Sequence, residues 1–369
     1  MTPDLQAEQA LLGALLLDGH QVGKVAGVLQ ARHFLRPAHH ALYQLLLDQH
    51  TAGHPGSLDH ASDDDRRDWA MQAMTAAQQA SRGFTPGYGQ ALIFACPSAS
   101  HASAYARMVL ESAARREMHE HATRLLQAAN TGELQSTVRL IAALRQVISE
   151  HVATWGSDDT SLSVPSDAGH SDAGAQKRMA EAAATDETML LGSLTARPGP
   201  INSIAQWLLP ADFQVPGHGR LFDALTALRG RGDPVDHLTL LWEFQQHGGL
   251  AELTTDQVRE ISRCDVAADP HYWAERVLQN ALIASTARAA QRVRNLTTDT
   301  ATTTTALLGS CAQALEPLSE QQRRLADSAR TTVPRGGPVL SAPPRTKPPS
   351  PIATTTVTPP LPARSPRGR

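Results

Sequence analysis

The sequence predicts an all-α protein built from two copies of one helical unit. Alanine and leucine are abundant, and aromatic residues make up only 4% of the 369-residue chain. Alanine and leucine enter helices at little cost, whereas aromatic and β-branched residues favour strands. The second observation is an internal repeat, because the stretch EQALLG at residues 8–13 returns as ETMLLG at residues 187–192. We therefore expect two helical domains and no sheet.

The repeat keeps its register without a gap from Glu8 to Pro55. After a middle of unequal length, residues 105–117 align with residues 274–286. A chance match would not hold one offset over this distance, so the two stretches are copies of one unit. Aligned pairs include Leu29 and Leu208, Phe34 and Phe213, Pro37 and Pro216, His39 and His218, Tyr43 and Phe222, and Pro55 and Pro234.

The apolar pattern in each copy predicts a compact group of helices, here called the head. In the first copy, leucines at helical spacing between Leu5 and Leu16 make one apolar face. The apolar residues from Val22 to Leu29 predict a second helix. A third helix begins at Pro37, which suits a first turn, and stops at Gly53. The acidic run at residues 63–65 can start a further helix, since negative side chains favour a helix N-terminus.

A pair of long helices follows each head. Residues 101–129 and 133–154 are separated by NTG, and residues 270–296 and 302–328 by a Thr/Asp stretch. Such breaks between long helical patterns predict an α-hairpin in each copy.

Gly13 and Gly192 interrupt leucine-rich helices at equivalent positions. Glycine inside a helix costs about 1 kcal/mol relative to alanine. Because both copies carry it, we expect a close helix crossing at which a Cβ atom would clash.

Composition divides the chain into four segments. We predict a first helical domain at residues 1–154, a linker at 155–182, a second helical domain at 183–329 and a tail at 330–369. The linker is rich in Gly, Ser and Asp, and the tail is rich in Pro, Thr and Arg. Neither has apolar periodicity, so we expect both to be disordered.

Charge and cysteine usage exclude several protein classes. The net charge of -3 gives no global attraction to nucleic acids or membranes. No apolar run is long enough to span a membrane, and the N-terminus does not resemble a signal peptide. Cys96, Cys264 and Cys311 are far apart, which favours free thiols in a reducing compartment. We therefore expect a soluble, cytoplasmic protein.

No residue pattern predicts catalysis, a cofactor or a metal site. His39 and His218 lie just inside the third helix of each head, without a second histidine and a carboxylate at metal-binding spacing. We interpret both as capping or packing residues. The charged residues of 101–129, Glu117 among them, are interpreted as a solvated face with i,i+4 pairs.

The second hairpin is the more basic one, and four of its arginines are candidates for contact with nucleic acid. These are Arg276, Arg288, Arg292 and Arg294. With the arginines of the tail, they would neutralise backbone phosphates. The alternative is a solvent-exposed helix face, and the scarcity of nearby aromatic residues gives no support for base stacking.

Longer stretches of both copies match a known pattern. The first copy has LQAEQALLGALLLDG and then LQARHFLRPAHHALYQLLLDQHTAGHP. The second has LLPADFQVPGHGRLFDALTALRGRGDPVDHLTL and, at the entry to its hairpin, DPHYWAERVLQNALI. Both copies resemble the N-terminal domain of the DnaB-type bacterial replicative helicases, over residues 5–154 and 183–300.

The resemblance implies an all-helical head with an α-hairpin that makes no catalytic contribution. In that family the domain pairs with its neighbours in a collar and contacts primase and helicase loaders. Family helicases continue into a RecA-like motor with a G-x-x-x-x-G-K-[ST] phosphate loop. No such string occurs here, since the one Gly-Lys pair, Gly23-Lys24, is followed by valine. We therefore expect no enzyme activity.

Two function classes follow. The first is a non-catalytic scaffold linked to DNA replication that binds a replicative helicase, a primase or a helicase loader. The alternative is a nucleic-acid-binding regulator that uses the basic hairpin and the tail. A weaker possibility is a relic of a duplicated helicase gene without a retained partner.

In the resembled family, the hairpin of one subunit packs on that of its neighbour. Here residues 101–154 and 270–328 supply both hairpins, so we expect an intramolecular pseudo-dimer. The rival expectation is that each hairpin packs on its own head or on another chain. The candidate interface residues are Met108, Leu126, Leu144, Leu278, Leu282 and Val293.

Overall fold

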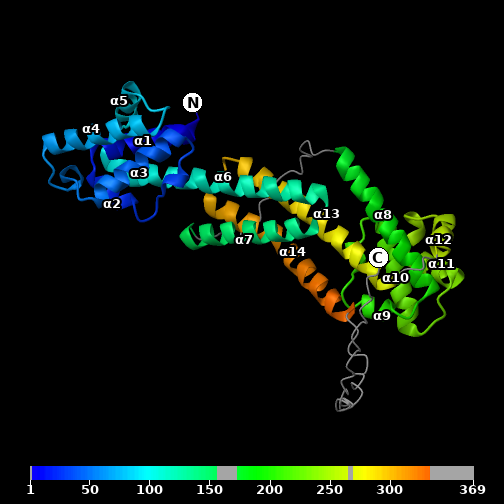
Figure 1. Ribbon diagram of the computed structural model, residues 1–369. Helices are drawn as coiled ribbons and strands as arrows, with labels where there is room; N and C mark the ends of the chain where they lie inside the picture. Colours follow the sequence, from blue (N-terminus) through cyan, green and yellow to red (C-terminus); the bar gives the residue numbers. More distant parts are fainter. Residues whose placement is uncertain (1, 156–172, 265–268, 333–369) are drawn as a thin grey trace, which may run out of the picture. The chain divides into compact units, whose positions relative to one another are not determined.

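The computed structural model describes residues 2–155, 173–264 and 269–332 (Figure 1). Within these ranges, all regular secondary structure is α-helix or short 3-10 helix, which confirms the predicted all-α class. None of the described helices combines the length and apolar character needed to cross a membrane. The predicted tail lies outside the described residues except at its start, because the last helix runs to Thr332.

The first head is a bundle of short helices around one apolar core. The core contains several fully buried large side chains, among them Leu11, Tyr43 and Trp69. The Trp69 indole N–H donates to the carbonyl of Leu15 over 2.8 Å, so the largest buried side chain also has its polar atom satisfied. The helices are α1 (Pro3–Leu17), α2 (His20–Val25), α3 (Pro37–Thr51), α4 (Asp63–Ala80) and α5 (Pro86–Ala95), with short 3-10 turns η1 (Ala31–His33), η2 (Pro55–Ser57) and η3 (Ala99–His101).

The ends of these helices follow the sequence signals. Pro37 occupies the first turn of α3, and Ser62 caps α4 in a reciprocal capping box with Asp65. Thr85 caps α5 by accepting from the backbone N–H of Tyr88. Such caps satisfy backbone groups that have no partner inside the helix.

The glycine inside the first helix marks a close crossing of α1 and α5. A Cβ atom added at Gly13 would lie 2.9 Å from the Cβ of Cys96 and closer still to the carbonyl oxygen of Leu92. In the second head, a Cβ atom at Gly192 would lie 2.7 Å from the carbonyl oxygen of Ile261. The predicted reason for the repeated glycine is therefore confirmed in both copies.

The second head repeats this plan with differences in length. Its first helix, α8 (Ala173–Ala196), begins inside the predicted linker, so residues 173–182 are helical. The remaining helices are α9 (Ile201–Ile204), α10 (Pro216–Arg231), α11 (His237–Gln246) and α12 (Thr255–Ser262), with η4 (Pro210–Asp212) and η5 (Gly249–Ala251). They enclose a separate core that includes Leu191, Phe222 and Phe244.

Each head leads into an α-hairpin, close to the predicted bounds. The first consists of α6 (Ala102–Thr131) and α7 (Leu134–Trp155), and the second of α13 (Pro270–Thr298) and α14 (Thr304–Thr332). Gly132 ends α6 with a φ of 72°, a left-handed conformation that favours glycine. Alanine and valine side chains at the start of α6 complete the core of the first head.

Candidate functional site

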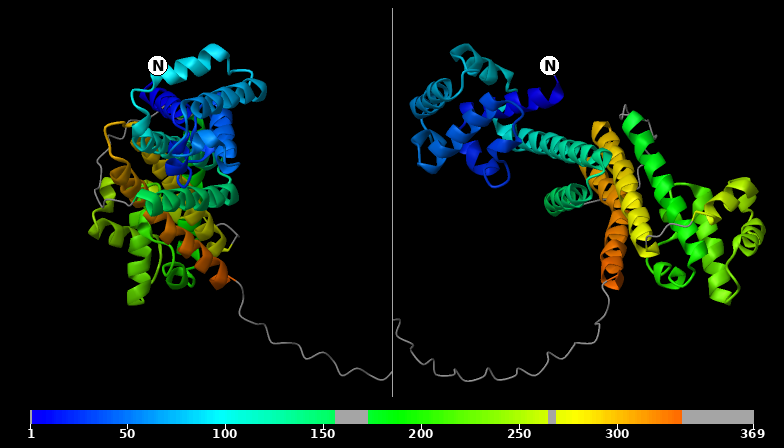
Figure 2. Two further views of the ribbon diagram at one scale, coloured as in Figure 1. Left: turned by 90° about the vertical axis from the view of Figure 1, so that its left-hand side faces the viewer. Right: turned by 45° about the vertical axis from the view of Figure 1, so that its right-hand side comes forward.

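All four hairpin helices contribute to one apolar core, here called the hairpin cluster. Its buried side chains lie between Met118 and Ile148 in the first hairpin and between Leu282 and Leu318 in the second. Figures 1 and 2 show α6 and α13 side by side. The two hairpins therefore shield the same apolar surface from water, which is the dominant favourable contribution to their association.

Polar contacts cross between the hairpins at both of their faces. Arg115 of α6 donates to the carbonyl oxygen of Asp299 over 2.8 Å, at the end of α13. Four residues further along α6, His119 Nδ1 lies 3.0 Å from the Thr297 hydroxyl. From the first contact to the second, the residue number rises along α6 and falls along α13, so the two helices are antiparallel. On the other side, Arg145 of α7 donates to the Leu315 carbonyl over 2.8 Å.

The structure separates the six predicted interface residues into three groups. Leu126, Leu144, Leu282 and Val293 are buried in the hairpin cluster. Leu278 is buried in the core of the second head instead. Met108 is 48% exposed and belongs to neither core.

The charged face of α6 is only partly the solvated face that the sequence indicated. Arg107 and Glu111 form an i,i+4 pair, as expected. Arg115, however, contacts the other hairpin, and Arg116 donates to the carbonyl oxygen of His33 in the first head over 2.7 Å. Glu117 accepts from His151 of α7 over 3.2 Å, and this hydrogen bond holds the pKa of Glu117 below its ordinary value.

The four arginines proposed for nucleic-acid contact do not form one cationic surface. Arg276 is paired with Asp186 of α8 over 3.0 Å. Arg294 is half-buried beside His119, and it donates to Gln291 on its own helix. Arg288 and Arg292 are exposed on α13. Neutralising adjacent phosphates needs several free cationic groups on one face, so this geometry adds no support to the nucleic-acid alternative.

A buried carboxylate–imidazole pair recurs in both heads, and it is not among the features predicted from the sequence. His39 Nδ1 lies 2.6 Å from Glu8 Oε2, and His218 Nδ1 lies 2.8 Å from Glu187 Oε2. In each head, the other carboxylate oxygen accepts a backbone N–H just before the third helix, from Leu35 in the first head. Each pair therefore fixes the first helix to the start of the third, which confirms a packing role for both histidines.

The contact with glutamate assigns a proton to Nδ1 of each histidine. An ionised carboxylate only accepts, so Nδ1 of each histidine donates to its glutamate. In a neutral imidazole, Nε2 is then an acceptor. In the first head, the Tyr88 hydroxyl lies 2.7 Å from His39 Nε2.

A second unpredicted pair fixes the last helix to the second head. Arg324 of α14 and Asp212 of η4 are 8% and 4% exposed, and Arg324 Nη2 donates to Asp212 Oδ1 over 2.9 Å. Arg324 also donates to the carbonyl of Trp207 over 3.0 Å. Residue His33 stands at the aligned position in the first head, so the pair has no counterpart there.

Comparisons with known proteins agree on one kind of domain. A family profile described as "DnaB-like helicase N terminal domain" matches residues 1–111 and 180–279. The replicative DNA helicase DnaB of Mycobacterium leprae is 34% identical over 130 residues, which is 35% of this chain and 20% of the relative.

Two further relatives give the same picture. The replicative DNA helicase DnaB of Leifsonia xyli is 31% identical over 34% of this chain and 25% of its own length. The replicative DNA helicase DnaC of Bacillus subtilis is 26% identical over 29% of this chain and 24% of its own length. The matches thus span about a quarter or less of the curated relatives. No solved structure matches the chain.

Proposed function

The chain belongs to the DnaB-like helicase N-terminal domain family, and from this premise we propose that it is a non-catalytic, collar-type scaffold linked to DNA replication. Its partners are a replicative helicase, a primase or a helicase loader. In this role the two heads offer binding surfaces, and the hairpins hold the heads together.

The observation that carries this proposal is the hairpin cluster. Its buried side chains come from both copies, and Arg115, His119 and Arg145 add polar contacts between them. A tandem chain that pairs its own hairpins would present two collar heads as one unit. A linker of about 20 residues raises the local concentration of the second hairpin to roughly millimolar, which favours pairing within the chain.

The absence of enzyme activity is part of the same proposal. The phosphate loop of family helicases supplies backbone N–H groups and a lysine to an anionic nucleotide. The sequence contains no such loop, and the family match covers head and hairpin segments alone. We expect no ATP hydrolysis and no nucleotide binding by the purified chain. Hydrolysis at ordinary enzyme rates that persists through further purification would contradict this.

The pairing within one chain is tested with a disulfide across the two hairpins. His119 Nδ1 lies 3.0 Å from the Thr297 hydroxyl, so the double variant His119→Cys/Thr297→Cys places two thiols at facing positions of the two hairpins. Under mild oxidation at low protein concentration, we expect a cross-linked monomer on a non-reducing gel. Peptide mapping by mass spectrometry should then identify the 119–297 disulfide.

The single variants His119→Cys and Thr297→Cys serve as controls and should give no new cross-link. A covalent dimer from the double variant would mean that the hairpins pair between chains. Absence of the 119–297 disulfide in the folded double variant would contradict this pairing of α6 with α13.

Partner binding is tested with purified replication proteins. Sedimentation of the chain with a replicative helicase, a primase and a loader from the same cell should give a complex with one of them. Because an apolar interface depends weakly on salt, the complex should persist at about 0.5 M salt, where exposed charges are screened. Absence of binding to all three, together with DNA binding that weakens steeply with salt, would favour the nucleic-acid alternative.

A further inference from the structure

The two heads differ at the histidine of the buried Glu–His pair. In the first head, the Tyr88 ring lies nearly parallel to the His39 ring, with a centroid distance of 5.9 Å and an interplanar angle of 10°. The Tyr88 hydroxyl lies 2.7 Å from His39 Nε2. This head therefore fills the space beside its own histidine with a phenol.

The second head places glutamine where the first has tyrosine. Thr85 and Thr254 cap equivalent helices, α5 and α12, and each accepts from the backbone N–H three residues later. That third residue is Tyr88 in the first head and Gln257 in the second. Both helices then cross the first helix of their head at its glycine, which places the two residues at matching positions.

Gln257 does not replace the missing hydroxyl. Its side-chain oxygen accepts from the backbone N–H of Thr254 over 2.8 Å, so the side chain turns back to the helix end. His218 is 6% exposed, and within the described part of the chain its ring hydrogen-bonds only to Glu187, through Nδ1. The other ring nitrogen, Nε2, makes no hydrogen bond within the described residues, and His218 lines a pocket.

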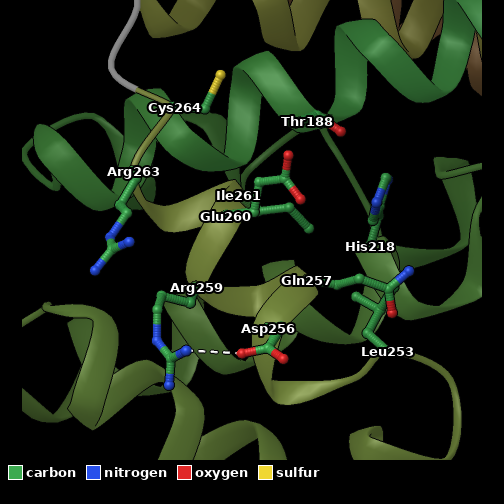
Figure 3. Close-up of a pocket in the computed structure, with 10 residues that line it drawn as sticks. All are labelled: Thr188, His218, Leu253, Asp256, Gln257, Arg259, Glu260, Ile261, Arg263 and Cys264. Carbon is green, nitrogen blue, oxygen red and sulfur yellow. Dashed lines mark hydrogen bonds and ion pairs between the residues drawn. The ribbon is translucent and has the colours of Figure 1, made fainter.

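A pocket of about 630 Å³ opens at this position. Figure 3 shows His218 at its wall, with Gln257 and Leu253 nearby. Leu253 stands where the first head has Phe84, whose ring packs edge-on against Tyr88. The pocket combines apolar side chains such as Leu253 and Ile261 with the His218 imidazole and a charged rim, and its volume is ample for one aromatic ring. The charged residues of the lining are Asp256, Arg259, Glu260 and Arg263.

We propose that the pocket beside His218 binds a tyrosine side chain of a partner protein, whose hydroxyl donates to His218 Nε2. The first head shows the complementary arrangement within one chain, since Tyr88 makes this contact with His39. A phenol would donate to this ring nitrogen while burying its ring against the apolar part of the lining. The inference rests on the chemistry of one head and does not depend on the scaffold role.

The probes are N-acetyltyrosine amide and N-acetylphenylalanine amide, which differ by the one hydroxyl group. Titration of the isotope-labelled chain, followed by amide NMR, should show saturable shifts at residues around His218 with the tyrosine probe. We expect millimolar affinity, as is usual for a ligand of this size, and at least about tenfold weaker binding of the phenylalanine probe.

Two matched variants exchange the residue that distinguishes the heads. Gln257→Tyr should fill the pocket from within and abolish the shifts around His218. Tyr88→Gln should open the equivalent site in the first head and add a second set of shifts around His39. If Tyr88→Gln does not fold, the Gln257→Tyr variant still decides the question.

Three results would overturn the proposal. The first is equal binding of the two amides, because the hydroxyl would then play no part. The second is unchanged binding by the Gln257→Tyr variant. The third is binding of free p-cresol without binding of the tyrosine amide, which would indicate a small phenolic ligand instead of a protein side chain.

Discussion

Replacing Gly192 by alanine should destabilise the second head, although alanine is the better helix former. Within α8, the exchange gains about 1 kcal/mol in helix propensity. The new methyl group would lie 2.7 Å from the Ile261 carbonyl oxygen and 2.9 Å from the Cys264 Cβ atom. The Ile261 oxygen is part of the crossing backbone, and the Cys264 Cβ atom is bonded directly to it. Neither atom can move aside as the end of a flexible side chain can.

Overpacking of this kind costs about 1–3 kcal/mol, so after the gain in helix propensity we expect a net loss of up to about 2 kcal/mol. Gly230 is the matched control, because it also lies inside a helix and a Cβ atom there meets nothing within 4 Å. Gly230→Ala should raise the free energy of unfolding by about 0.5–1 kcal/mol.

Urea unfolding followed by circular dichroism at the helix band measures both variants. A lower midpoint for Gly192→Ala with an unchanged m-value would agree with lost stability of the same folded state. If Gly192→Ala were as stable as Gly230→Ala, the close crossing would not be the reason for the glycine. Gly13→Ala should repeat the loss in the first head, against the Cys96 Cβ atom at 2.9 Å.

Three further predictions concern the hairpins and the ionisable groups. Leu282→Asp should lower the free energy of unfolding by about 3–5 kcal/mol, because it puts an unpaired carboxylate into the hairpin cluster. Met108→Asp, at an exposed site, should change it by less than about 0.5 kcal/mol. The midpoints of urea unfolding compare the two variants. Burial and the charge of Arg32 lower the pKa of His33 from 6.5 to about 4. Between these pH values only the unfolded chain takes up the proton, so stability should fall by about 1–2 kcal/mol from pH 6.5 to pH 4, and His33→Gln should flatten that part of the profile. Burial raises the pKa of the Cys311 thiol to about 12. At pH 8 this thiol should therefore react with a thiol reagent far more slowly than the thiol of the half-buried Cys96. Equal reaction rates would show that the hairpin cluster opens readily.

The helical plan could be predicted from the sequence because its signals are local. Proline at the start of α3, the acidic first turn of α4 and the NTG break between α6 and α7 each act within a few residues. The predicted end of the linker at residue 182 was wrong for the same reason, since α8 begins at Ala173. Its first turns, from Ala173 onward, were read with the Gly/Ser-rich stretch before them, although residues 178–187 are rich in alanine and glutamate, which favour helices.

Contacts between distant elements could be predicted only where both copies of the repeat carry the same pair of residues. Glu8 and His39 recur together as Glu187 and His218, so their pairing carried a signal that a comparison of aligned polar positions would have found. Arg324 and Asp212 are 112 residues apart and occur in one copy, so nothing in the sequence linked them. Met108 and Leu278 have the helical spacing of interface residues, but spacing alone does not say which core a helix face meets.

The sharing of one hairpin cluster by two linked copies has a consequence for symmetry. In a two-fold homodimer, one substitution changes both sides of the interface at once, and both sides must tolerate it. Here each half of the interface is encoded separately, so a substitution in one hairpin leaves the other hairpin unchanged. The Arg324–Asp212 pair and the exchange of Tyr88 for Gln257 are one-sided differences of this kind. A tandem chain therefore fixes the ratio of its two heads at one to one while it allows their binding preferences to diverge.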